Sequence, residues 1–160
     1  LTFQMAVEDY RRQGYSEKWI NERMRSIEMR KELTDEWQRA GIHEQKDFAI
    51  LTNILTKAWS GMTTGEYKRH KGLTKENLRD NMTNVELALN TLAEVTATEI
   101  SRQRNPKGMA QSSQTAREGG EVARNARADI ESRIGRSVIS SKRALDYIHP
   151  IEDTKAKELE

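Results

Sequence analysis

The sequence predicts an all-α fold, a bundle of two or three long helices with several short capped helices. Three observations lead to this prediction. Residues of high helix propensity (Ala, Glu, Lys, Arg, Leu, Gln and Met) dominate the chain. Val, Ile, Thr and aromatic residues nowhere form alternating runs of strand length. With two prolines and nine glycines in 160 residues, the chain also has few obligatory breaks.

Composition indicates a thin core with large charged faces. Apolar residues are 35% of the sequence and charged residues 32%, a balance that suits an extended helical shape or an oligomer, so we expect a homo-oligomer. The absence of cysteine excludes disulfides, thiolate metal sites and cysteine nucleophiles, and fits a cytoplasmic protein. No apolar run approaches the roughly 18 residues that span a bilayer, and no signal peptide pattern is present.

The N-terminal part contains signals for three helices. A short helix is predicted from Thr2 to Arg12, ending near Gly14. Ser16 has the character of an N-cap for a long helix over 17–40. The apolar stripe of this long helix changes register between Ile27 and Leu33, which predicts a kink near Thr34 or a second packing partner. Residues 47–59 are apolar on most sides, which indicates a central helix. We expect Trp19 and Trp37 to anchor helix packing.

Threonines mark the helix starts in the middle of the chain. Thr63 with Glu66 fits a capping box, opening a short helix to about residue 70, with Gly72 after it. Thr83 with Glu86 fits a second capping box, opening a long helix toward residue 102. Between them, Thr74 is expected to cap a short helix over 75–81.

The C-terminal third alternates polar and helical segments. Residues 109–118 are polar and predict a loop or a weak helix. The glycine pair at 119–120 marks either a helix start or a close backbone approach. A helix follows over 121–134 and ends at Gly135. A last short helix runs from Ser140 to Tyr147, and residues 149–160 form an acidic tail that we expect to be mobile.

No constellation of catalytic or metal-ligating residues is visible in the sequence. His43, His70 and His149 are far apart and fit no metal-ligand spacing. No phosphate-binding glycine loop, dinucleotide fingerprint or nucleophile elbow occurs. We therefore predict a protein that is not an enzyme, without catalytic residues, metal, cofactor or small-molecule substrate.

Positive charge is concentrated late in the chain. Residues 101–143 hold ten basic and four acidic side chains, net +6, within a chain of net charge +2. Such a block favours an anionic partner; the alternative is a solvated arginine-rich helix, or cations placed by the dipole of a helix end. The candidate nucleic-acid-binding residues are basic and fall in two groups, Lys68, Arg69 and Lys71 near the middle, and Arg117, Arg124, Arg127 and Arg133 downstream.

Several short segments, in order, resemble one protein family. They are Asp47-Phe48-Ala49-Ile50, Lys71-Gly72-Leu73 and Glu86-Leu87-Ala88, with Asp80, Met82, Asn90, Glu99 and Gly120. Over roughly residues 20–145 the chain resembles the C-terminal region of DNA-damage-inducible protein D, and similar segments occur in BRO-type prophage antirepressor-like proteins.

The resemblance implies a regulatory domain of the bacterial DNA-damage (SOS) response, with recombinase–DNA filaments or DNA as partner. Full-length members carry an N-terminal BRO-type domain, and because the chain starts at Leu1 we expect it to be a fragment. The expected organisation is an N-terminal extension over 1–15, a helical C-terminal regulatory domain over 16–148, and the acidic tail. The alternative function is a direct nucleic-acid-binding module that uses the basic arginine face.

Overall fold

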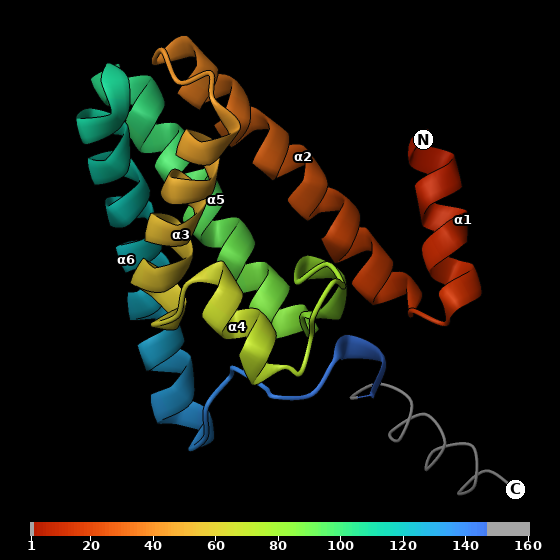
Figure 1. Cartoon of the computed structure of the whole chain (residues 1–160). Coiled ribbons are helices and arrows are strands. Elements are labelled where there is room, and N and C mark those ends of the chain that lie inside the picture. Colours follow the sequence, from red (N-terminus) through yellow and green to blue (C-terminus); the bar gives the residue numbers. More distant parts are fainter. Residues whose placement is uncertain (1, 147–160) are drawn as a thin grey trace, which may run out of the picture.

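The computed structural model describes residues 2–146, and this part of the chain is helical with no strand (Figure 1). The prediction of an all-α fold is therefore confirmed. The elements in chain order are α1 (Phe3–Gln13), α2 (Glu17–Arg39), α3 (Gln45–Ser60), α4 (Thr64–His70), the 3₁₀ turn η1 (Arg79–Asn81), α5 (Asn84–Arg104) and α6 (Gly108–Ile134).

Among the four long helices the most extensive contacts are those of α5 with α6, α3 with α6, and α2 with α5, and α3 also contacts α5 (Figure 1). Helix α1 packs against α2, and α4 packs against α3. The largest core side chains are Trp19, Trp37 and Trp59, each at most 1% exposed. The predicted packing role of Trp19 and Trp37 is thus confirmed. Helix α3 contacts α6, α5 and α4, and its Phe48 stacks on Trp37 of α2, but it is not enclosed on all sides, since Ile50 is 47% exposed.

The predicted helix starts are formed by the side chains named for them. Ser16 accepts a hydrogen bond from the Trp19 amide at the start of α2. Thr63 and Thr83 each form a complete capping box, with Glu66 and Glu86 respectively. These caps satisfy amides that have no partner within the first turn, and they fix where each helix begins.

Helix α6 differs from the prediction, because residues 108–134 form one uninterrupted helix. The segment predicted as a loop or weak helix is therefore its first half. The buried face there consists of Ser112, Thr115, Ala116 and Gly119, which are small or polar and give no apolar stripe in the sequence. Of the two predictions for the glycine pair, the close backbone approach is confirmed and the helix start is wrong. Gly119 faces α5 and Gly120 faces α3.

The segment 75–81 is also less helical than predicted, since only the η1 turn forms there. The Thr74 hydroxyl donates a hydrogen bond to the Glu76 carboxylate at 3.2 Å instead of accepting one from an amide. Asn77 takes the capping role, because its Oδ1 accepts from the Asp80 amide at 3.1 Å. A three-residue turn results where a helix was expected.

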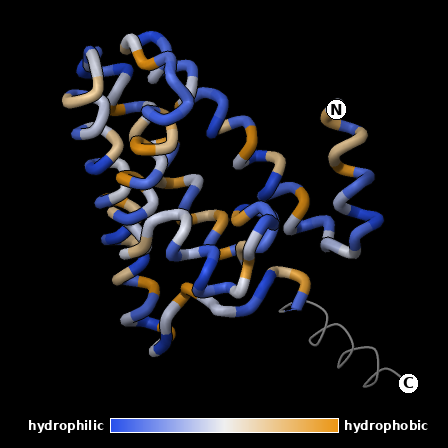
Figure 2. Tube along the Cα trace, in the orientation of Figure 1, coloured by the Kyte–Doolittle hydropathy of each residue, from blue (hydrophilic) through white to orange (hydrophobic). Residues whose placement is uncertain are grey.

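Helix α2 has no interruption at Thr34, and its buried face continues through the apparent change of register. Ile27, assigned to the apolar stripe, is 40% exposed. The inward positions of this middle part are held by Arg23 and Ser26, which are buried, and by the partly buried Arg30. Figure 2 shows how polar and apolar residues alternate along the long helices. The stripe of α2 is therefore continuous in space but polar at its centre.

The C-terminal segment returns across the molecule after α6. Val138 and Ala144 join the core, and residues 144–146 are helical. The predicted helix end at Tyr147 and the predicted mobile tail at 149–160 lie outside the described residues. Within residues 2–146 no helix is long and apolar enough to cross a membrane.

Three glutamates join neighbouring parts of the fold, and each has a lowered pKa. Burial raises the pKa of Glu36, but hydrogen bonds from Arg39 and Ser101 outweigh it. A hydrogen bond from Arg104 lowers the pKa of Glu118. Burial likewise opposes the lowering at Glu131, where the Val138 amide and Arg127 donate.

We expect stability to fall on acidification below about pH 4.5, the ordinary value of a glutamate. The folded pKa lies below the unfolded one, so in this range the unfolded chain binds more protons. The stabilisation is complete above the unfolded pKa and is lost as pH falls through the folded pKa. Urea unfolding at about pH 7, 5 and 3 measures it.

The variant that carries Glu36→Gln, Glu118→Gln and Glu131→Gln should be less stable at neutral pH and lose less stability on acidification. A control that replaces three exposed glutamates, Glu8, Glu28 and Glu99, by glutamine should keep the wild-type pH profile. Identical pH profiles for the two triple variants would contradict the attribution of the acid sensitivity to Glu36, Glu118 and Glu131.

Candidate functional site

Lys71, predicted as a nucleic-acid contact, is instead a buried structural residue. Its side chain is 0% exposed, and its Nζ donates to Glu86 Oε1 at 2.8 Å and to the carbonyl oxygens of Ser140 at 2.8 Å and Lys142 at 2.7 Å. All three ammonium protons are used, so Lys71 has none left for a phosphate. Burial lowers the pKa of Lys71, and the Glu86 carboxylate offsets part of this effect.

Tyr67 completes this buried cluster, because its hydroxyl donates to Glu86 Oε2. Burial, the charge of Glu86 and this hydrogen bond raise the pKa of Tyr67 well above its ordinary value. The cluster ties α4, the start of α5 and the C-terminal segment together. Glu86 therefore serves both as a capping-box acid and as the partner of Lys71.

Two of the downstream arginines lie together on the surface. Arg117 and Arg124 are seven residues apart on α6, hence on one side of the helix, and both are exposed. With Lys57 of α3 they line one shallow depression beside Glu121. We call Lys57, Arg117 and Arg124 the cationic face. Within residues 2–146 none of the three forms an ion pair with a carboxylate, and Arg117 donates to the Gln114 side chain at 3.0 Å.

The remaining predicted residues are placed differently. Arg127 is partly buried and donates to the Ser60 carbonyl at 2.9 Å and to Glu131 at 3.0 Å, which closes the end of α3. Arg133 is exposed and pairs with Asp129 at 3.0 Å. Arg69 is exposed on α4, whereas Lys68 lines a small cavity between α3, α4 and the η1 region. The seven candidates are therefore not one surface.

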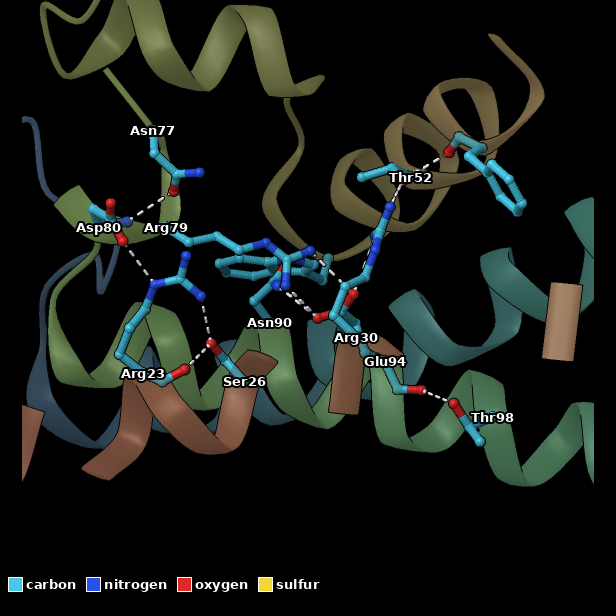
Figure 3. A network of polar contacts seen from close by, with 12 residues as sticks. Arg23, Ser26, Arg30, Thr52, Asn77, Arg79, Asp80, Asn90, Glu94 and Thr98 are labelled. Atoms are coloured by element: carbon cyan, nitrogen blue, oxygen red, sulfur yellow. Dashed lines mark hydrogen bonds and ion pairs between the residues drawn. The ribbon is translucent and has the colours of Figure 1, made fainter. Parts of the chain in front are cut away.

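A second polar centre, absent from the sequence prediction, is buried among α2, α5 and η1 (Figure 3). Glu94 is 0% exposed and receives a bidentate contact from Arg79, at 2.7 and 3.0 Å. Arg30 donates to the same carboxylate at 3.2 Å, and so does the side-chain Nδ2 of Asn90, also at 3.2 Å. We call these four residues the Glu94 network. It holds two guanidinium groups against one carboxylate.

Asp80 extends the polar contacts toward the N-terminus. Its carboxylate accepts from Arg23 at 2.8 Å and from the Tyr10 hydroxyl at 2.8 Å. The Tyr15 hydroxyl donates to the Asp80 carbonyl at 2.6 Å. Burial raises the pKa of Tyr10 and of Tyr15 to about 12. These contacts fix α1 and the loop before α5 onto α2.

The chemistry of these groups is that of charge pairing. Glu94 is fully engaged by donors, so it is not positioned as a free general base. Within residues 2–146 no group of three or more His, Asp or Glu side chains is arranged to hold a metal ion. Sequence reasoning missed Lys57 because it lies on another helix. It also missed the Glu94 network, since no pattern in the sequence pointed to Glu94.

The fold and these charged groups define an all-helical domain with a buried ion network and an exposed cationic face. Residues 14–147 match the family model of the DinD C-terminal domain, and the chain belongs to this family. The family sets the chain in the context of DNA-damage-inducible proteins. Searches of the curated proteins and of the solved structures found no match.

Proposed function

We propose that this domain is a non-enzymatic regulatory module that contacts DNA phosphates, free or within a recombinase–DNA filament, through the cationic face. The observation that carries the proposal is the gathering of Lys57, Arg117 and Arg124 from two helices on one exposed surface. Within the described residues these cations have no carboxylate ion-pair partner, so their charge is available to an anion. Arg is suited to phosphate because its planar guanidinium offers two parallel donors.

Other residues support this surface in unequal ways. Arg69 and Arg133 are exposed and stay in the proposal as further candidate contacts, although Arg133 also pairs with Asp129. Arg127 contributes positive charge near the face, although its donors already hold the end of α3. Lys68 faces a separate cavity, and Lys71 is left out because of its burial.

The recombinase filament and self-association form the finer part of the proposal, together with the link to BRO-type antirepressor-like proteins. An apolar groove between α5 and α6, with Val85, Leu92 and Ile130 in its lining, suits a protein surface better than a nucleic acid. In a filament complex, the cationic face would meet DNA while a protein surface meets the groove.

We expect Arg117→Glu with Arg124→Glu to weaken binding to single-stranded DNA at least about tenfold. The slope of log K against log salt should fall in magnitude by about 1.4, since each phosphate contact to a single strand contributes about 0.7. Fluorescence anisotropy of a labelled oligonucleotide at several salt concentrations measures both. The same titration with preformed recombinase–DNA filaments reports binding to the filament. Sedimentation then reports the oligomeric state of the domain.

The matched control reverses two exposed cations on α2, Arg25→Glu with Lys31→Glu, which changes the net charge equally. It should leave the DNA affinity within about twofold of wild type. Equal losses in both variants would reduce the effect to overall charge. Filament binding without binding to free DNA would assign the face to the filament, and no binding to either would refute the proposal.

A further inference from the structure

A small polar cavity lies between α3, α4 and the η1 region, apart from the cationic face. Its volume is about 150 Å³, and the polar residues that line it include Thr52, Thr56, Thr64, Lys68 and Arg79. At about 30 Å³ per water, the space corresponds to about five water molecules. Orthophosphate has five non-hydrogen atoms, so a group of that size fits.

Several potential donors line this cavity. Thr56 is 3% exposed as a residue and brings its hydroxyl to the lining. Lys68 is half-buried, and within residues 2–146 it forms no ion pair with a carboxylate. Asn77 uses its Oδ1 for the Asp80 amide, which leaves its NH₂ group as a donor. Thr56, Lys68 and Asn77 can therefore donate to an acceptor that enters the cavity.

The net charge of the side chains around the cavity is positive. Arg79 lines it, and Arg30 donates to Thr52 in its wall at 2.5 Å. Both guanidinium groups share the single carboxylate of Glu94 (Figure 3). Lys68, in the lining of the cavity, adds a third positive charge. Burial lowers the pKa of Arg30, and the nearby Arg79 lowers it further while Glu94 opposes both. The excess positive charge is therefore costly without an anion.

The side chains, and not the end of α4, make this site. The first amide of α4, at Thr64, already donates to the Asn53 side chain at 3.0 Å. The free donors come instead from Thr56 of α3, Lys68 of α4 and Asn77 of the loop before η1. Potential donors from three segments therefore converge on one cavity, as is common in ligand-binding pockets.

We propose that this cavity binds a phosphate group, with Lys68 as the charge partner and the Thr56 hydroxyl as the buried donor. The phosphate comes either from free orthophosphate or from the terminal phosphate of a nucleic-acid strand. Both sources present the same doubly charged, acceptor-rich group, and the Glu94 network supplies the positive surroundings that it needs.

Titration with inorganic phosphate against sodium chloride at equal ionic strength tests the site, read by thermal unfolding and by ³¹P NMR line width. Wild-type protein should show a phosphate-dependent rise in the unfolding midpoint and line broadening. Lys68→Met and Thr56→Val should each weaken phosphate binding by about tenfold or more, because each removes a donor to a charged acceptor.

Matched variants separate binding from folding. Thr56→Ser keeps the hydroxyl and should retain phosphate binding, as should Lys75→Met, which removes an exposed lysine beyond Gly72. The Arg117→Glu, Arg124→Glu variant should also respond like wild type, which keeps this inference distinct from DNA binding at the cationic face. Equal responses to phosphate and chloride, or an unchanged phosphate affinity in both Lys68→Met and Thr56→Val, would overturn it.

Oligonucleotides distinguish the two sources. Tighter binding of a 5′-phosphorylated strand than of the same strand with a 5′-hydroxyl, lost in Lys68→Met, assigns the site to a strand end. Equal binding of the two strands, together with the response to inorganic phosphate, assigns it to free orthophosphate.

Discussion

Replacing Glu94 by alanine is expected to lower the free energy of unfolding by about 3 kcal/mol. The substitution leaves two guanidinium groups, those of Arg30 and Arg79, without the carboxylate that they share. Their side chains are 27% and 17% exposed, so water compensates them only in part. Asn90 loses an acceptor as well. An uncompensated buried charge costs more than the pair itself contributes, which makes this a large effect.

Urea unfolding at neutral pH, followed by far-ultraviolet circular dichroism, measures the change. Glu94→Gln keeps the volume and one oxygen acceptor, and should fall between wild type and the alanine variant. The matched control is Glu99→Ala on the same helix, which breaks an ion pair with Arg102 whose members are 61% and 44% exposed. We expect it to cost less than about 1 kcal/mol. Equal losses for the two alanine variants would contradict the role of burial.

Helix starts were predicted best, because their signals are local. A capping threonine and its glutamate lie within four residues of each other, and the amides they satisfy belong to the same turn. The sites at Thr63 and Thr83 formed as predicted for that reason. The Thr74 prediction failed because its hydroxyl donates to Glu76, while Asn77 accepts from the Asp80 amide three residues further on, and propensity alone does not rank these local alternatives.

Apolar periodicity succeeded only where the buried face is apolar. In α2 the inward positions between Met24 and Leu33 hold polar side chains, and a hydrophobicity pattern reads them as a break. Ser26 is buried because it accepts a hydrogen bond from Arg23, which in turn pairs with Asp80. Arg30 lies inward because it donates directly to Glu94 of α5. The first half of α6 was missed for a related reason, since its core face is made of serine, threonine, alanine and glycine.

Charge patterns located cations but not their accessibility. Lys71 and Lys68 are three residues apart in one basic run, yet one is enclosed by Glu86 and two carbonyl groups and the other lines a cavity. Conversely, Lys57 joins Arg117 and Arg124 only because α3 and α6 pack closely. The composition of a surface that spans two helices depends on tertiary packing, which a linear reading of one chain does not contain.

That packing rests on the glycine pair of α6, and adding a methyl group there should be strongly destabilising. A Cβ on Gly119 would lie 2.6 Å from the Ala93 carbonyl oxygen and 2.7 Å from the Ala97 amide nitrogen of α5. A Cβ on Gly120 would overlap the Ala58 methyl group and lie 2.7 Å from the Leu55 carbonyl oxygen of α3. Because most of these neighbours are backbone atoms, the helices themselves must move apart.

Each single alanine substitution is expected to cost about 2 kcal/mol net, since overpacking of about 3 kcal/mol is offset by a gain of about 1 kcal/mol in helix propensity. The double variant should lose more than either single variant, because α6 is then displaced from both α5 and α3, and its departure from the sum of the two losses measures the coupling of these adjacent sites. Thermal unfolding and urea titration measure both losses. Gly65→Ala in α4 is the matched control, because its Cβ would meet only the Arg69 guanidinium at 3.8 Å. It should be neutral or stabilising by up to about 1 kcal/mol.

The same variants connect the fold to the proposed function. If the α3–α6 contact assembles the cationic face, Gly120→Ala should weaken DNA binding even at temperatures where the protein stays folded, because it separates Lys57 from Arg117 and Arg124. Gly119→Ala acts on the α5 side and should affect DNA binding less. Stable, fully active Gly120→Ala protein would show that α3 and α6 do not need this close approach, and it would remove the structural basis of the cationic face.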